Sequence, residues 1–84
     1  MGRTKYIVGT LKNSSCVSCL IFEEMVNHSD MACNFKNILG AGFVFIVNGD
    51  YSPEVSVYGE SISLGVKSRD EDMGVIKRTL GLPT

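Results

Sequence analysis

The order of elements is set most clearly by the stretch FVFIVNGDYSPEVSVY, residues 43–58. Its first five residues are all apolar, which predicts a strand that is buried on both faces. Asn48-Gly49 follows, and this pair accepts the positive φ angles of a tight turn. Residues 54–58 then alternate between polar and apolar side chains. We therefore expect them to pair back onto residues 43–47 as an antiparallel hairpin.

A second hairpin is expected near the beginning of the chain. Residues 5–11 are rich in β-forming side chains, residues 12–15 form a polar turn cluster, and residues 16–22 resume the strand character. The competing interpretation is a helix through Cys16–Val26, because Ser15 has the side chain of an N-cap. The β-formers favour the strand.

A short helix is expected between the two hairpins. Ser29 is a candidate N-cap, and Met31, Ala32 and Phe35 would form one apolar helix face. Asn37 is expected to end this helix. The segment thereby connects residues 16–22 to the apolar strand.

The last third of the chain predicts an extended segment followed by a longer helix. Residues 60–67 read as extended backbone after a break at Gly59. Ser68 and Glu71 fit a capping box, in which each side chain accepts a hydrogen bond from the other residue's amide. The helix would run to Leu80, with a glycine closing it at position 81.

Together these elements predict a single α+β domain over residues 1–84, in the order ββαββα. We expect a four-stranded, mainly antiparallel sheet with two short helices on one face. The apolar strand at residues 43–47 would then need cover on its other face, and a second copy of the chain would supply it. The sequence therefore predicts a homo-oligomer, most simply a dimer.

Composition excludes several classes of function. The 84 residues carry a net charge of −1, so no basic surplus exists for non-specific binding to nucleic acid. The longest apolar run, residues 40–47, is too short to span a bilayer. The N-terminus has no apolar signal segment, and three cysteines is an odd count that fits reduced thiols. We expect a cytoplasmic protein.

Cysteine and histidine spacing raises the alternative of a zinc-binding module. Cys16, Cys19, His28 and Cys33 are residue types that bind zinc. However, residues three apart in a strand point to opposite faces, so Cys16 and Cys19 would not converge on one ion. We therefore expect structural cysteines, no bound metal and no cofactor.

No arrangement of residues indicates catalysis. His28 is the only histidine, and it reads either as a helix-entry residue bonded to backbone or as a ligand contact. The carboxylates of residues 70–72 belong to an exposed first helical turn, where no burial would raise a pKa. We expect a binding protein rather than an enzyme.

A candidate anion site lies around the start of the last helix. Ser61 and Ser63 would share a strand face, and Lys67 and Arg69 flank the predicted cap at Ser68, where free amides favour an anion. The competing interpretation is a capped helix with solvated basic side chains. An exposed Arg69 would then contribute less than about 0.5 kcal/mol to stability. The candidate ligand-binding residues, with His28 as an added contact, are Ser61, Ser63, Lys67, Ser68, Arg69 and His28.

The segments at residues 28–32, 40–44 and 58–65, with Ser68-Arg69-x-Glu71-Asp72, resemble short, uncharacterised proteins of bacteriophage and prophage accessory regions. This resemblance implies an accessory role in the host cytoplasm, in which a small oligomer blocks or sequesters a host component. It supplies no catalytic residues.

Two classes of function are therefore expected. The first is a non-enzymatic binder that sequesters a small anionic ligand, such as a nucleotide, in a groove of the oligomer. The second is a protein-interaction or inhibitor module that docks on a host protein through its sheet face or through the loop carrying Tyr51.

Overall fold

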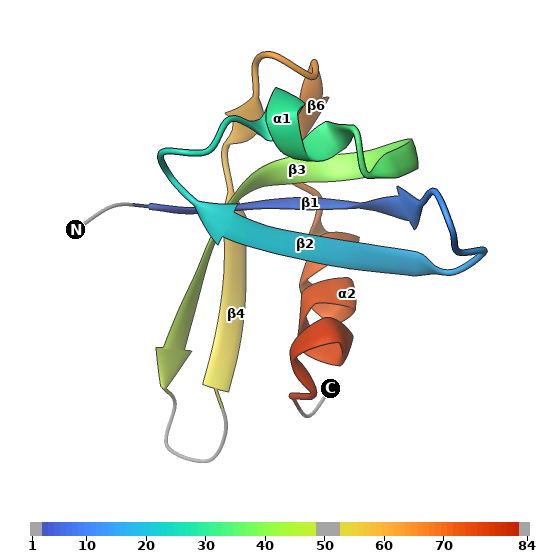
Figure 1. Cartoon of the computed structure of the whole chain (residues 1–84). Helices are drawn as coiled ribbons and strands as arrows, with labels where there is room; N and C mark the ends of the chain where they lie inside the picture. Colours follow the sequence, from blue (N-terminus) through green and yellow to red (C-terminus); the bar gives the residue numbers. More distant parts are fainter. Residues whose placement is uncertain (1–2, 49–52, 83–84) are drawn as a thin grey trace.

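The computed structural model describes residues 3–48 and 53–82, and it contains six strands and two helices in these ranges (Figure 1). In chain order the elements are β1 (Thr4–Leu11), β2 (Val17–Glu23), α1 (His28–Ala32), β3 (Phe35–Asn48), β4 (Pro53–Tyr58), β5 (Glu60–Ser61), β6 (Val66–Lys67) and α2 (Asp70–Leu80).

The main sheet has the strand order β2-β1-β3-β4, and every neighbouring pair is antiparallel. This confirms the predicted α+β fold and both predicted hairpins, and it places residues 17–23 in a strand rather than a helix. The segment at residues 60–67 is not one extended piece. It folds into a separate hairpin, in which the two short strands β5 and β6 pair with each other.

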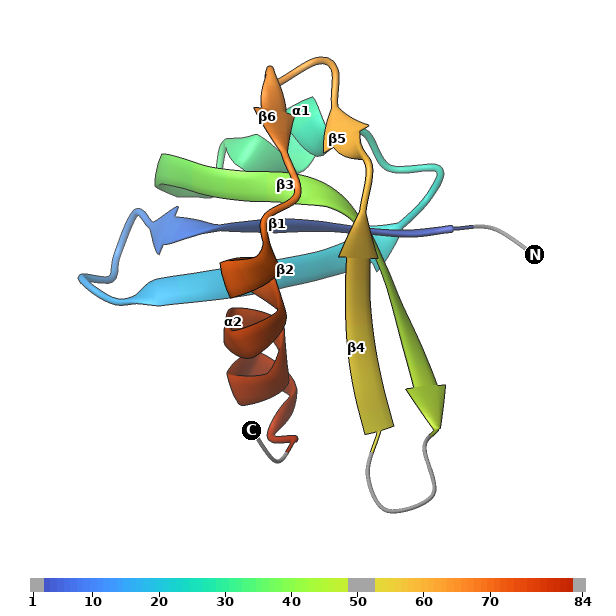
Figure 2. The same cartoon turned by 180° about the vertical axis from the view of Figure 1, so that it is seen from behind.

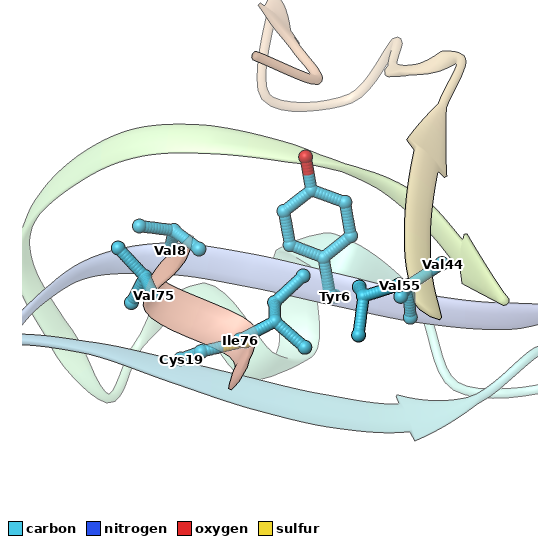
Figure 3. Close-up of a cluster of buried hydrophobic side chains, with 7 residues drawn as sticks. All are labelled: Tyr6, Val8, Cys19, Val44, Val55, Val75 and Ile76. Carbon is cyan, nitrogen blue, oxygen red and sulfur yellow. The ribbon is translucent and has the colours of Figure 1, made fainter. Parts of the chain in front are cut away.

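The central strand β1 is buried on both faces. Tyr6, Ile7 and Val8 have no exposed surface (0%), although alternate residues of a strand point to opposite sides. Tyr6 and Val8 pack against Val75 and Ile76 of α2, as Figure 3 shows. The core is therefore built outward from β1 in both directions.

The two helices lie on opposite faces of the sheet, so the prediction that both share one face was wrong. Ile7 belongs to a second apolar cluster, which includes Met31 and Ala32 of α1 and Leu64 and Val66 of the β5–β6 hairpin. Figure 2, viewed from behind, has α2 in front of β1 and β2, with α1 beyond β3. Apolar side chains of β1 point to both faces of the sheet, and one helix covers them on each face.

Strand β3 continues past the end of β1, and this changes the burial of its apolar run. The last residue pair between β1 and β3 is Thr4 with Val44. Beyond it, Phe45, Ile46 and Val47 pair with β4 alone among the described strands, and they are 49%, 47% and 48% exposed. The prediction that residues 43–47 are buried on both faces was therefore wrong, because the run extends beyond the central strand. We call residues 45–47, with residues 54–56 of β4, the arm.

Helix α1 begins two residues before the predicted position, and helix α2 begins one residue after it. Helix α1 starts at His28 after the cap residue Asn27, and it ends at Ala32, before the start of β3. Helix α2 is capped by Arg69, whose amide donates to the carboxylate of Asp72 at 3.0 Å. The Ser68–Glu71 capping box was therefore wrong by one residue.

The predicted closure of α2 is confirmed at Gly81, which adopts a left-handed φ of 72°. The Asn48-Gly49 turn and Tyr51 fall in residues 49–52, outside the described ranges. Neither described helix is long and apolar enough to cross a membrane.

Candidate polar pocket beside an aromatic row

A pocket of about 560 Å³ opens between the first residues of β1, the start of α1 and the β5–β6 hairpin. Its lining includes Arg3, Lys5, Phe43, residues 27–29 and residues 60–63. Three of the predicted ligand-binding residues, His28, Ser61 and Ser63, meet here. We call this site the polar pocket.

The floor of the polar pocket follows from the register of the sheet. Lys5 pairs with Phe22 on one side and with Phe43 on the other, and Phe43 pairs in turn with Tyr58. These four residues therefore form one cross-strand row, with one residue from each strand. Residues directly opposite in an antiparallel pair share a face, so all four side chains lie on the α1 side of the sheet.

Neighbouring rings form a continuous series on this face of the sheet. We call it the aromatic row, and its members are Phe22, His28, Phe43, Tyr58 and Phe45. Ring centroids are 5.3 Å apart for Phe22 and His28, 6.1 Å for His28 and Phe43, and 5.5 Å for Phe43 and Tyr58. Phe45 lies 5.9 Å from Tyr58. These separations fall within the range of favourable aromatic pairs.

Two cations border the polar pocket. The ammonium of Lys5 donates to the carbonyl of Val26 at 2.9 Å, which leaves two of its three donor hydrogens for other partners. The guanidinium of Arg3 lies 4.4 Å from the ring centroid of Phe43 and 3.5 Å from the carboxylate of Glu24. Because that ion pair is exposed, it contributes little to stability and can be exchanged for another anion.

His28 is held at the inner side of the polar pocket by a backbone contact. Its Nε2 lies 3.0 Å from the carbonyl oxygen of Gly42, so Nε2 carries the hydrogen and donates it. Burial lowers the pKa of His28 below its usual value of 6.5, and the charge of Lys5 lowers it further. The imidazole is therefore neutral at pH 7, in agreement with the backbone-bonded interpretation of this residue.

The two serines reach the polar pocket because the chain turns sharply after β4. Gly59 makes the turn at a φ of 74°, and a side chain there would meet the ring of Phe43 at 2.9 Å. Ser61 is buried, and its Oγ lies 3.4 Å from the Oγ of Ser63. Hydroxyls both donate and accept, so the pair can bind an anion or a neutral polar group.

The other three predicted site residues do not line the polar pocket. Lys67 is exposed and pairs with Glu60 across the β5–β6 hairpin. The amide of Ser68 donates to the carbonyl of Gly59. Arg69 is directed to the start of α2, where its guanidinium binds Asp72 through Nε at 3.0 Å and Nη2 at 2.7 Å.

Asp72 is a fully buried carboxylate with a complete set of donors. Besides the guanidinium contacts of Arg69, it accepts from the amide of Arg69 at 3.0 Å and from the hydroxyl of Tyr6 at 2.6 Å. Burial raises the pKa of the Tyr6 phenol well above its usual range, and the bond to Asp72 raises it further. The carboxylate of Asp72 thus occupies the start of α2, where the sequence predicted that an anionic ligand would bind.

The cysteines lie apart from the polar pocket. Cys16 and Cys33 are exposed, whereas Cys19 is buried against α2, where desolvation raises the pKa of its thiol to about 12. Among the described residues, no three His, Cys, Asp or Glu side chains come together as metal ligands. The absence of zinc stays a prediction, to be checked by elemental analysis.

The sequence prediction missed Arg3, Lys5 and the aromatic row. Arg3 and Lys5 are two residues apart at the start of a strand, which places them on one face. That signal is present in the sequence. It identifies a site only once the strand register is known, because the register places Lys5 between Phe22 and Phe43.

Comparison with protein-family models, with curated proteins and with solved structures found no match to this chain.

Proposed function

We propose that this protein is a non-enzymatic binder of a small anionic ligand, which it holds in the polar pocket. The observation that carries the proposal is the convergence of Arg3, Lys5 and the hydroxyls of Ser61 and Ser63 around one concave site. Ligand sites combine apolar walls with a few such polar groups, and the aromatic row supplies the wall.

Charge supports an anion rather than a cation at this site. The lining has two positive side chains and one carboxylate, that of Glu60, in a chain whose net charge is −1. The second carboxylate nearby, Glu24, lies outside the lining and binds Arg3 through the exposed ion pair that an anionic ligand would replace. The neutral His28 adds no charge of either sign at pH 7. Its Nε2–H is donated to the carbonyl of Gly42, which holds the ring in place beside the site.

The replacement Lys5→Gln is expected to weaken binding of inorganic phosphate by roughly 10- to 100-fold, because it removes a charge-assisted hydrogen bond. Affinity is measured by calorimetry. His28 gives a second measurement, because a single histidine produces one unambiguous set of ring resonances, and phosphate should shift them.

Lys12→Gln is the matched control, since it removes the same charge from an exposed position at the other end of β1, outside the polar pocket. Its phosphate affinity should stay within about twofold of the wild type, since surface substitutions remote from a site have small effects. Unshifted His28 resonances at millimolar phosphate would contradict the proposal. If Lys67→Gln lowered the phosphate affinity more than Lys5→Gln does, the anion would instead bind near the start of α2, as the sequence predicted.

A second candidate function, self-association, is favoured by the arm. Past Thr4, no described strand pairs with Phe45–Val47 on the β1 side, and these three apolar residues are 49%, 47% and 48% exposed. Open apolar edges are templates for strand pairing. We propose that this stretch of β3 pairs antiparallel with the same stretch of a second copy about a two-fold axis, so that both copies contribute the same residues and each contact occurs twice.

The variant Ile46→Lys is expected to convert a dimer into a monomer, because a lysine on an edge strand opposes pairing. Light scattering at tens of micromolar measures the mass. Ile62→Lys is the control, since Ile62 is 88% exposed and lies away from the arm. A wild-type chain that is already monomeric at this concentration would end the dimer proposal, and would leave a host protein as the partner of the arm.

A further inference from the structure

We infer that the anionic ligand of the polar pocket carries a flat ring, as a nucleoside monophosphate does. The phosphate would lie at Arg3 and Lys5, and the base would stack on the exposed end of the aromatic row at Tyr58 and Phe45. This inference rests on the proposed function, because it takes the anion site as given and identifies what is attached to the anion.

The first observation is a second pocket that adjoins the polar pocket. It has a volume of about 480 Å³ and is lined by Arg3, Tyr58 and residues 44–46, among others. Arg3 lines both pockets, so a single ligand that contacts this guanidinium can extend from one pocket into the other. One pocket offers charges and hydroxyls, and the other offers rings.

The second observation is the state of the rings. Phe43 covers Tyr58 in a stacked arrangement, with an interplanar angle of 23°. Tyr58 is nevertheless 38% exposed and Phe45 is 49% exposed, although both are large apolar side chains on a sheet face. A solvent-exposed ring already supported from behind is the geometry in which proteins stack bases.

The third observation is the charge beside these rings. The guanidinium of Arg3 lies over Phe43, at 4.4 Å from its centroid, and so reaches the aromatic row from the phosphate side. A nucleotide joins its base to its phosphate through a sugar, and the sugar hydroxyls would face Ser61 and Ser63. The two halves of the ligand thus match the two halves of the site.

The test compares three probes: inorganic phosphate, ribose 5-phosphate and adenosine monophosphate (AMP). Stacking of one base strengthens binding by about 5- to 150-fold, so AMP should bind more tightly than ribose 5-phosphate by a factor in this range. Tyr58→Leu should abolish this gain and lower the affinity for AMP far more than the affinity for ribose 5-phosphate. Tyr58→Phe retains the ring and should retain the gain.

The outcomes separate this inference from the proposed function. If inorganic phosphate binds but AMP binds no better than ribose 5-phosphate, or if Tyr58→Leu leaves the gain intact, the inference fails and anion binding stands. If none of the three probes binds, the proposed function itself fails. A six-residue oligoadenylate that binds more than tenfold tighter than AMP would overturn the assignment to a free nucleotide.

Discussion

Replacing Arg69 by alanine is expected to lower the free energy of unfolding by about 3 kcal/mol. The variant leaves the fully buried carboxylate of Asp72 without its guanidinium, and breaking a buried ion pair costs roughly 3–5 kcal/mol. We take the lower end because the side chain of Arg69 is 31% exposed, so water can partly replace it. In a domain of this size, 3 kcal/mol corresponds to a melting temperature lower by roughly 12–24 °C.

Thermal unfolding measures this effect, and Arg78→Ala is the control. Arg78 is an exposed arginine of the same helix, and its loss should cost less than about 1 kcal/mol. An Arg69→Ala variant that melts within 3 °C of the wild type would show that the ion pair with Asp72 is not formed in solution. The expectation of a cost below 0.5 kcal/mol, which assumes an exposed side chain, would then hold.

The variant Gly40→Ala is expected to destabilise the protein by about 3 kcal/mol or more. A methyl group at this position would lie 2.8 Å from the carboxyl carbon of Asp72, and closer still to its Oδ2. Overpacking alone costs roughly 1–3 kcal/mol. The carboxylate would also have to move away from Tyr6 and Arg69, so the two costs combine.

Gly74→Ala is the matched control for this substitution. Gly74 lies inside α2, where an added methyl group meets nothing within 4 Å. Alanine in an exposed helical position is more stable than glycine by about 0.5–1 kcal/mol, so this variant should melt later than the wild type. Equal melting temperatures for the two alanine variants would contradict the close contact between β3 and α2.

The two hairpins of the sheet could be predicted from the sequence, because local patterns of residues determine them. The hairpins at residues 5–22 and 43–58 follow from β-forming runs separated by turn residues, and both are present. The side of the sheet on which each helix lies is a long-range property. It depends on β1 being central, and nothing local in Tyr6-Ile7-Val8 distinguishes a strand covered twice from a strand covered once.

The candidate site was predictable to a smaller extent. His28 in α1 and the two serines of the β5–β6 hairpin lie close together in the structure. Arg69 turns away because its guanidinium binds Asp72. The sequence gives no sign that Asp72 is buried, since it occurs in the acidic run Asp70-Glu71-Asp72, which reads as solvated. Only the glycine at position 40 makes room for its carboxylate.

The hydrogen bond between Tyr6 and Asp72 joins residues that are 66 positions apart, and this has a consequence for biosynthesis. Ribosomes add about 5–20 residues per second, so roughly 3–13 s separate the synthesis of these two residues. The β1–β2 hairpin is local and can form early, within about 10 μs of becoming available. Its α2-facing side chains stay uncovered until the helix emerges, and nascent chains are open to chaperones throughout that interval.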